Sequence, residues 1–300
     1  MEIHAPKEWY DLLDVLEKEK GIVILLGATD TGKSFLAKFL ITHLCKQGVN
    51  VALVDADIGQ SFLGPPTTIG LALFDSAPDW EKVLPTDIFF IGSTTPEGNL
   101  PLHLKGVKRM VDKAISHSAD VILVDTTGFI SGEAGKELKR RKIDLLSPQF
   151  IIALQRSGEL EDILESYKGN PIYKIHRLPI SEQVRLRSKE ERTKYRVRKF
   201  KEYFEGSETK ELPIEGIRLE GRVLDSSGFA IPLEWALSIK GVLLGFKDMN
   251  DETLALGVIE NYVEEGRILL TSTPLKVISK VKAIHFGSLR LTTSYEEERF

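Results

Sequence analysis

Short apolar runs alternate with helix-like segments along the chain up to about residue 180. The runs rich in Val, Ile, Leu and Phe lie at residues 22–26, 49–55, 87–92, 121–125, 150–154 and 171–176. Helical periodicity covers residues 8–19, 35–44 and about 104–117. Continuous apolar strands that alternate with helices indicate a mostly parallel sheet covered by helices on both faces. We therefore predict an α/β fold for this part of the chain.

The pattern changes after about residue 180. Residues 181–205 are typical of one long basic helix, and the chain becomes β-rich after Gly206. Candidate strands or strand pairs lie at residues 219–224, 236–246, 253–262, 268–273 and 277–291. We place a domain boundary near residue 212. This gives an α/β domain over residues 1–211, which includes the basic helix, and a small β-rich barrel or sandwich over residues 212–300.

A phosphate-binding loop follows the first apolar run. Residues Gly27–Ser34 fit the pattern G-x-x-x-x-G-K-[ST] between a predicted strand and a predicted helix. Backbone N–H groups and the helix N-terminus would cradle phosphate oxygens, Lys33 would reach the β/γ-phosphates, and Ser34 would bind Mg²⁺. The alternative is a chance loop with a helix-capping serine. We assign nucleotide binding to Gly27, Thr29, Asp30, Thr31, Gly32, Lys33, Ser34 and Phe35, which predicts a P-loop NTPase.

Carboxylates stand at the ends of two further predicted strands. Asp55 and Asp57 share one face of the chain after the second strand, so both can point at the γ-phosphate, and Gln60 can orient a nucleophile. The alternative is a polar loop with a capping Asp. Asp125 ends another strand, where it either supports Mg²⁺ through water or only caps a loop.

The basic helix carries two arginines on one face. Arg192 and Arg196 are four residues apart, so their guanidinium groups can clamp a transferring phosphoryl group. The same segment can track a nucleic-acid backbone. The alternative is a solvated charged helix, which is what most runs of charge are.

Composition and missing motifs exclude several classes. The 300-residue chain has a net charge of −4, so contact with nucleic acid must come from a local basic patch. It lacks the Asn-Lys-x-Asp motif of guanine switches, a G-x-G-x-x-G after a strand, and the protein-kinase motifs. The single cysteine excludes an internal disulfide and suits a cytoplasmic location. We expect neither a signal peptide at residues 1–7 nor a membrane span.

Together these motifs resemble the polynucleotide 5′-hydroxyl kinases of the P-loop class. That family includes the RNA kinase of pre-mRNA cleavage and pre-tRNA splicing and a kinase of ribosomal-RNA processing. The matching pieces cover roughly residues 20–206 in the family's order. They are Gly27–Ser34, Asp55–Gln60 with Gly64–Pro66, Gly92–Asn99, Thr126–Phe129, and Arg192–Arg196 followed by Tyr203 and Phe204.

The resemblance implies ATP and Mg²⁺ as cofactors and a role for each motif. Lys33, Asp57, Arg192 and Arg196 would be catalytic, with Asp57 as general base or metal-linked activator and the two arginines in a lid. Ser34, Asp55 and Asp57 would hold the metal, although which of Asp55 and Asp57 is the base stays open. Substrate contacts are implied for Gln60, Asn99, Thr126, Gly128 and Phe129, the last three in the family's substrate clasp. Phe129 stands where the family commonly has tryptophan, and its ring can still stack on a base.

The resemblance implies transfer of the ATP γ-phosphate to the 5′-hydroxyl end of RNA or DNA, with the preference between the two left open. The partner would be a single-stranded or end-exposed polynucleotide. One alternative is an ATP-binding scaffold or slow ATPase in RNA processing. Another is a small-molecule kinase whose basic lid contacts a phosphorylated metabolite.

Overall fold

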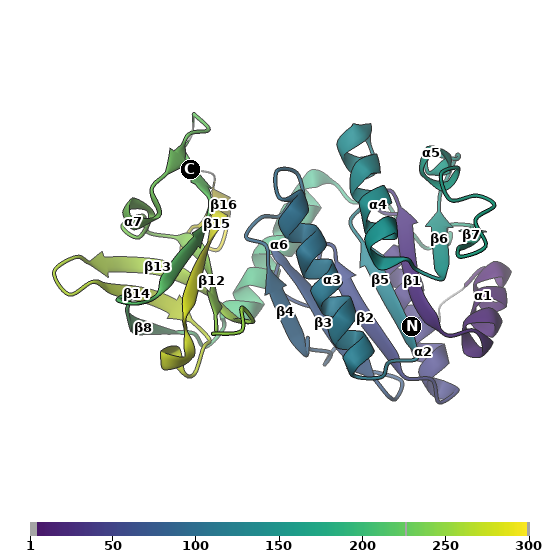
Figure 1. The fold of residues 1–300 in the computed structure, drawn as a ribbon, viewed down its shortest axis with the longest axis horizontal. Coiled ribbons are helices and arrows are strands. Elements are labelled where there is room, and N and C mark those ends of the chain that lie inside the picture. The colour runs from purple at the N-terminus through teal and green to yellow at the C-terminus, as the bar shows by residue number, and fades with distance from the viewer. Residues whose placement is uncertain (1–4, 226, 299–300) are drawn as a thin grey trace.

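The described part of the chain has two large β-sheets joined by one long helix (Figure 1). The computed structural model describes residues 5–225 and 227–298. Residues 1–4, part of the segment expected not to be a signal peptide, lie outside the described residues. In the part of the chain that is described, no helix is long and apolar enough to cross a membrane.

The N-terminal sheet has the strand order β4-β3-β2-β5-β1-β6-β7. Its five strands from β2 to β7 are mutually parallel, whereas β3 is antiparallel to both β2 and β4. The bounds are β1 Gly21–Gly27, β2 Val51–Ala56, β3 Thr68–Phe74, β4 Asp87–Phe90, β5 Val121–Thr126, β6 Phe150–Leu154 and β7 Lys174–Leu178. The predicted α/β class with a mostly parallel sheet is confirmed.

Helices cover both faces of this sheet, which explains the continuous apolar runs. Neighbouring strand residues point to opposite faces. Val23 and Leu25 therefore pack with α1 and α2, while Ile24 and Leu26 pack on the side of α3 and α4. The helix bounds are α1 Lys7–Lys18, α2 Lys33–Lys46, α3 Leu100–Ser116, α4 Gly132–Leu146 and α5 Glu161–Leu164.

Several sequence-based element bounds were wrong. Strand β3 and helix α4 were not predicted, and the predicted strand at 171–176 begins three residues later, at Lys174. The predicted helix at 181–205 begins only at Lys189, where Ser188 and Glu191 form a reciprocal capping box. Residues 179–188 instead form a strap that leads from β7 to α6 (Lys189–Phe204).

The C-terminal sheet is largely antiparallel, with the order β16-β15-β12-β13-β14-β8 and β9 paired in parallel with β15. Its first strand, β8, begins at Glu208, before the predicted boundary at 212. The bounds are β8 Glu208–Pro213, β9 Arg218–Gly221, β12 Val242–Lys247, β13 Thr253–Val263, β14 Ile268–Thr273, β15 Ala283–Leu291 and β16 Glu297–Glu298. Smaller elements are the hairpin β10 Val223–Leu224 with β11 Ala230–Ile231, α7 Leu233–Ala236 and a 3₁₀ turn at Ile278–Lys280.

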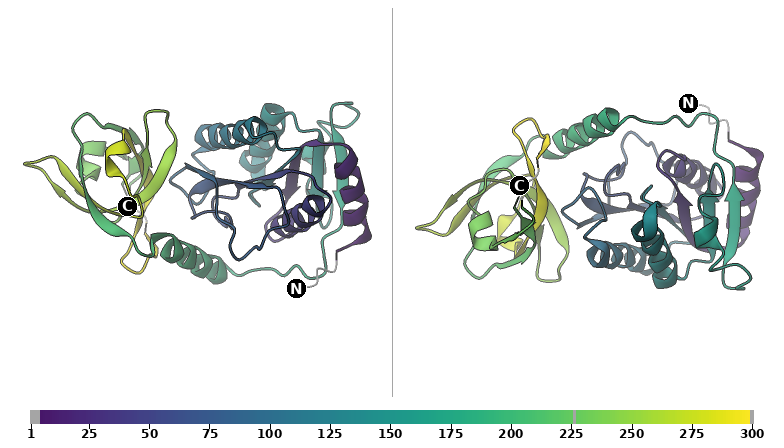
Figure 2. Two further views of the ribbon diagram at one scale, coloured as in Figure 1. Left: turned by 90° about the horizontal axis from the view of Figure 1, so that it is seen from below. Right: turned by 90° about the horizontal axis from the view of Figure 1, so that it is seen from above.

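Helix α6 spans the junction between the two sheets (Figure 2). Its Phe200 and Phe204 are buried in one cluster with Phe90 of β4 and with Leu243 and Leu256 of the C-terminal sheet. Phe90 also lies directly over Gly245, where a Cβ atom would be 2.3 Å from the Phe90 ring. The junction is therefore a continuous apolar core that fixes the helix relative to both sheets.

This junction should carry a large share of the stability. Phe200 is fully buried, so Phe200→Ala should lower the free energy of unfolding by about 3–5 kcal/mol, measured by urea denaturation. Trp235→Ala is the control, because Trp235 is 72% exposed and its loss should change the value by less than about 0.5 kcal/mol. Equal effects of the two substitutions would contradict a packed junction.

Candidate functional site

In the phosphate-binding loop, the side chain of the lysine is hydrogen-bonded to the backbone of the loop itself. Gly32 has a φ of 87° at the N-terminus of α2. The Lys33 ammonium donates to the carbonyl oxygens of Gly27 (3.0 Å) and Ala28 (2.8 Å). Burial lowers the pKa of Lys33, while the carboxylates of Asp125 and Asp57 raise it in part. A phosphate group entering the loop would give this cation an anionic partner in place of two carbonyls.

Asp125 reaches the P-loop from the end of β5. The Ser34 hydroxyl donates to Asp125 Oδ2 at 2.5 Å. Among the described residues, no donor reaches the other carboxylate oxygen, Oδ1, although it is buried. Burial raises the pKa of Asp125 to about 6, and Lys33 acts in the opposite direction. The Ser34 hydroxyl and the Asp125 carboxylate are thus in direct contact, and Asp125 Oδ1 is a buried acceptor without a donor among the described residues.

Asp55 has a different environment from the one expected of a metal ligand. It lies opposite Asp125 in the paired strands β2 and β5. Its Oδ2 accepts from the Ser61 hydroxyl (2.9 Å) and from the N–H groups of Phe62 (2.9 Å) and Leu63 (3.1 Å). Its Oδ1 accepts from the N–H of Asp57 at 3.1 Å. Both oxygens therefore accept hydrogen bonds from the loop after β2. This geometry favours Asp125 over Asp55 as the partner of Ser34 at a metal.

Asp57 lines the cleft above the P-loop with one oxygen engaged. Its Oδ1 accepts from the N–H groups of Gly59 (3.1 Å) and Gln60 (3.0 Å). These hydrogen bonds orient the carboxylate, and among the described residues no donor reaches Oδ2. The Gln60 amide donates to the carbonyls of Gly59 (2.8 Å) and Arg192 (3.4 Å), which links this loop to α6.

The predicted substrate clasp divides into buried and accessible residues. Thr126 is fully buried and donates to the Leu25 carbonyl of β1 at 2.7 Å, so it is part of the sheet core. Gly128 lies against the P-loop, because a Cβ atom there would be 2.5 Å from the Thr29 backbone. Phe129 is partly exposed, and Asn99 stands at the N-cap position of α3 without a capping hydrogen bond from its side chain. Thr126 therefore cannot touch a substrate in this conformation, contrary to the expectation.

The two lid arginines have different partners. Arg192 Nη2 binds Asp30 Oδ2 of the P-loop at 2.7 Å, and its buried Nε has no hydrogen-bond partner among the described residues. Arg196 instead pairs with Glu297 of β16 and donates to Thr193 at 3.3 Å. The lid therefore contacts the P-loop through Arg192, whereas Arg196 connects it to the C-terminal sheet.

A cleft of about 610 Å³ lies between the P-loop, the loop after β2, the strap and α6. Two residues that line it, Lys38 and Phe62, were missed by sequence reasoning. Four others belong to the predicted basic segment but were not assigned to the site: Arg187, Tyr195, Arg198 and Lys199. Tyr195 donates to the Ser61 carbonyl at 3.0 Å, and Lys199 donates to that of Phe62 at 3.2 Å. For the residues on α6 the sequence signal is their spacing, because Tyr195, Arg198, Lys199 and Glu202 lie on one face of the helix.

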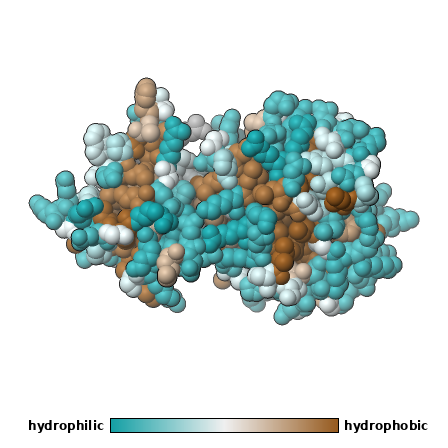
Figure 3. All heavy atoms as spheres, viewed as in Figure 1, coloured by the Kyte–Doolittle hydropathy of each residue, from teal (hydrophilic) through white to brown (hydrophobic). Residues whose placement is uncertain are grey.

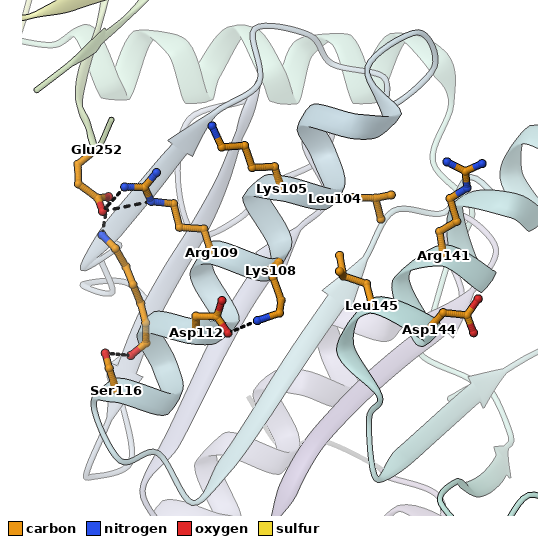
Figure 4. Close-up of a pocket in the computed structure, with 11 residues that line it drawn as sticks. Leu104, Lys105, Lys108, Arg109, Asp112, Ser116, Arg141, Asp144, Leu145 and Glu252 are labelled. Atoms are coloured by element: carbon orange, nitrogen blue, oxygen red, sulfur yellow. Dashed lines mark hydrogen bonds and ion pairs between the residues drawn. The ribbon is translucent and has the colours of Figure 1, made fainter. Parts of the chain in front are cut away.

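A larger hollow of about 910 Å³ lies elsewhere, between α3 and α4 (Figure 4). Leu104 and Leu145 face each other across it, in a region where apolar side chains reach the surface (Figure 3). The cationic side chains that line it already form ion pairs. Examples are Lys105 with Asp251 (2.9 Å) and Arg109 with Glu252 (2.6 Å). Because the P-loop does not line this hollow, the smaller cleft is the candidate active site.

Comparison with known families agrees with this geometry. Residues 27–206 match the family described as mRNA cleavage and polyadenylation factor CLP1 P-loop. The chain belongs to this family. The match spans the P-loop, both acidic strand ends and the lid helix, and it confirms the resemblance inferred from the short motifs.

Members of the CLP1 P-loop family also match over nearly the whole chain. A polyribonucleotide 5′-hydroxyl-kinase of Methanocaldococcus jannaschii is 28% identical, over 97% of this chain and 93% of its own. One of Thermococcus kodakarensis is 32% identical, over 92% of this chain and 89% of its own. The solved structure of the Clp1p–Pcf11p complex contains a chain of the same fold, with a TM-score of 0.74 and 17% sequence identity. The match covers 96% of this chain and 80% of that chain.

The buried carboxyls should make stability depend on pH. Burial, with the neighbouring Asp125 and Asp57, raises the pKa of Asp55 to about 7, and Asp125 is raised to about 6. At these two groups the folded chain binds more protons than the unfolded chain between about pH 4 and pH 7. Their contribution to the free energy of unfolding should therefore fall as pH rises through this window.

The variant Asp125→Asn tests this assignment because it removes one titrating group and keeps an oxygen for the Ser34 hydroxyl. Urea unfolding in metal-free buffer should show a smaller decrease with pH for the variant than for the wild type. Parallel pH profiles would mean that Asp125 does not titrate in this range.

Proposed function

We propose that this chain is a polyribonucleotide 5′-hydroxyl kinase, which transfers the γ-phosphoryl group of ATP to the 5′-hydroxyl end of RNA. The observation that carries the proposal is the convergence of Lys33, the Ser34–Asp125 pair and the open oxygen of Asp57 in one cleft beneath α6. The names of the full-length relatives support the same reaction.

ATP would occupy the cleft with its phosphates in the P-loop. The backbone N–H groups of Thr29, Asp30, Thr31, Gly32, Ser34 and Phe35 would surround the phosphates, with Gly27 allowing the tight turn. Lys33 would move from its two carbonyl partners to the β/γ-phosphates. The rest of the nucleotide would extend toward Lys38 and the strap.

The residues present fit a bound Mg²⁺. Ser34 Oγ and the unpartnered Asp125 Oδ1 are hard oxygen donors at one place. Among the described residues, no group of three His, Cys, Asp or Glu side chains forms a complete metal site, which suits an ion held mainly by phosphates and water. When bound, Mg²⁺ would neutralise charge on the phosphates. In this arrangement Asp55 orients the loop that carries Asp57.

Asp57 is proposed as the general base. The 5′-oxygen attacks the γ-phosphorus, the bond from that phosphorus to the β–γ bridging oxygen breaks, and the hydroxyl proton passes to Asp57 Oδ2. The bonds from Gly59 and Gln60 to Oδ1 hold the carboxylate in one orientation. Arg192 would release Asp30 and bind the transferring phosphoryl group instead. Its Nε, which has no hydrogen-bond partner among the described residues, would be a further donor to that group. Arg196 can join it only by releasing Glu297.

The polynucleotide end would approach from the side of Asn99, Gly128 and Phe129, with Gln60 near the nucleophile. Phe129 offers a partly exposed ring for stacking on a base, which suits a single-stranded or frayed end. The exposed cations that line the cleft, Arg187 of the strap and Arg198 of α6, would follow the phosphate backbone. A cytoplasmic location stays a prediction, based on the single free cysteine Cys45.

The direct test is incubation with γ-labelled ATP, Mg²⁺ and matched RNA and DNA oligonucleotides that carry either 5′-hydroxyl or 5′-phosphate ends. Label should appear only on 5′-hydroxyl ends, and the ratio of RNA to DNA labelling gives the acceptor preference. Label found solely in inorganic phosphate would contradict the proposal and favour a scaffold ATPase. Labelling of a small metabolite, unaffected by competing oligonucleotide, would favour a small-molecule kinase.

Lys33→Ala should lower kcat for transfer at least about 100-fold, because it removes the cation that stabilises charge on the phosphates. The measurement is steady-state labelling of a 5′-hydroxyl RNA by protein whose folding is verified by circular dichroism. Undiminished product formation by this variant would exclude the assigned P-loop role.

Arg192→Ala should lower kcat at least about 100-fold while changing the Kd for ATP far less, because its guanidinium acts on the transition state. Lys201→Ala removes a charge from the exposed face of the same helix and is the matched control. A parallel loss of ATP affinity and kcat in Arg192→Ala would instead indicate a role in ground-state binding.

A further inference from the structure

Two lysine side chains are fully buried on the inner face of α4. Lys139 and Lys142 are both 0% exposed and pack toward the sheet with Leu138 and Ile143 of the same helix. Burying an amine is costly unless its donors find acceptors, so an apolar residue would serve better if packing were the only requirement. Neither lysine has a role in the proposed chemistry so far.

Lys139 uses all three of its donors at the end of β5. Its ammonium contacts Thr126 Oγ1 (3.0 Å), Thr127 Oγ1 (3.3 Å) and the Thr127 carbonyl oxygen. These two threonines directly follow Asp125, the carboxylate that meets Ser34. The side chain therefore fixes the path of the chain at the point where it leaves the sheet beside the P-loop.

The contacts of Lys139 continue into the P-loop itself. The Thr126 hydroxyl donates a hydrogen bond to the Leu25 carbonyl of β1, two residues before Gly27. Gly128 follows Thr127 and lies against the Thr29 backbone, with no room for a Cβ atom. One buried ammonium thus links α4 to the strand that enters the P-loop and to the turn that packs on it.

Lys142 provides an internal contrast. It is buried to the same extent, one turn further along α4, but its ammonium nitrogen has no hydrogen-bond partner among the described residues. Burial lowers the pKa values of both lysines, so desolvation affects the two in the same direction. Hydrogen bonding to the end of β5 distinguishes Lys139 from Lys142.

We propose that Lys139 is a positioning residue for phosphoryl transfer, which acts through Thr126 and Thr127 to hold Asp125 against Ser34 and Gly128 against Thr29. This inference rests on the proposed kinase function. Misplacing reacting groups by about 1 Å can cost on the order of 100-fold in rate, so loss of the three hydrogen bonds should reduce turnover. Substrate binding should be affected less, because Lys139 does not line the cleft.

The test compares Lys139→Met with Lys142→Met in the γ-label assay with 5′-hydroxyl RNA. Both changes replace a buried amine by an apolar side chain of similar length. Lys139→Met should lower kcat by about 10–100-fold, while KM for RNA and Kd for ATP change by less than about threefold. Lys142→Met should keep the wild-type kcat, and its thermal unfolding midpoint should be unchanged or higher.

A second variant, Lys139→Gln, keeps two amide donors and should recover part of the lost kcat. It also keeps the test valid if Lys139→Met does not fold. Equal kcat values for Lys139→Met and the wild type would overturn the proposal. Equal losses in Lys139→Met and Lys142→Met would overturn it as well, because they would indicate a general effect of the buried charge.

The outcomes also separate this inference from the kinase assignment. If the wild-type protein labels no 5′-hydroxyl end, the proposed function fails. If the wild type labels 5′-hydroxyl RNA and only the predicted difference between the lysine variants is missing, the function stands and the role of Lys139 is refuted.

Discussion

Crowding of negative charge at the ends of β2 and β5 is the constraint that shapes this site. Asp55 and Asp125 are paired across neighbouring strands and fully buried, and Asp57 follows two residues after Asp55. Their mutual repulsion and burial must be offset, and each carboxylate is offset differently. Asp55 receives four hydrogen bonds from its own loop, Asp125 receives the Ser34 hydroxyl, and Lys33 lies within electrostatic reach of Asp125 and Asp57. Asp125 alone keeps a buried, unpartnered oxygen.

The second domain matters to this site because it holds the lid helix. The inner face of α6 is buried against β4 and the C-terminal sheet through Phe200 and Phe204. The hydroxyl of Tyr203 accepts from the Leu256 N–H at 2.9 Å, and Arg196 pairs with Glu297. The start of α6 is tied to the P-loop through Arg192 and Asp30. The helix is thus anchored at one end by an apolar core. Its other end is held only by polar contacts, the Arg192–Asp30 ion pair and hydrogen bonds from Gln60 to the Arg192 carbonyl and from Tyr195 to the Ser61 carbonyl, so this P-loop end is the part that can exchange partners.

Much of the fold was readable from the sequence because buried parallel strands must be apolar on both faces. The P-loop, both acidic strand ends and the lid were found because their chemistry requires a fixed spacing. Helix α4 was missed because Lys139 and Lys142 occupy inward positions and so mask its apolar face. Two features could not be predicted from a local pattern, because they depend on contacts between residues distant in the sequence. They are the different partners of Asp55 and Asp125 and the ion pair between Arg196 and Glu297.

The most direct test of this account locates the metal. Crystals grown with Mn²⁺ and a non-hydrolysable ATP analogue would reveal the ion by its anomalous scattering. The account predicts a peak beside Ser34 and Asp125, with Asp55 still bound to its loop and Asp57 free to face the acceptor hydroxyl. A peak coordinated by Asp55, with Asp125 remote from the ion, would contradict it.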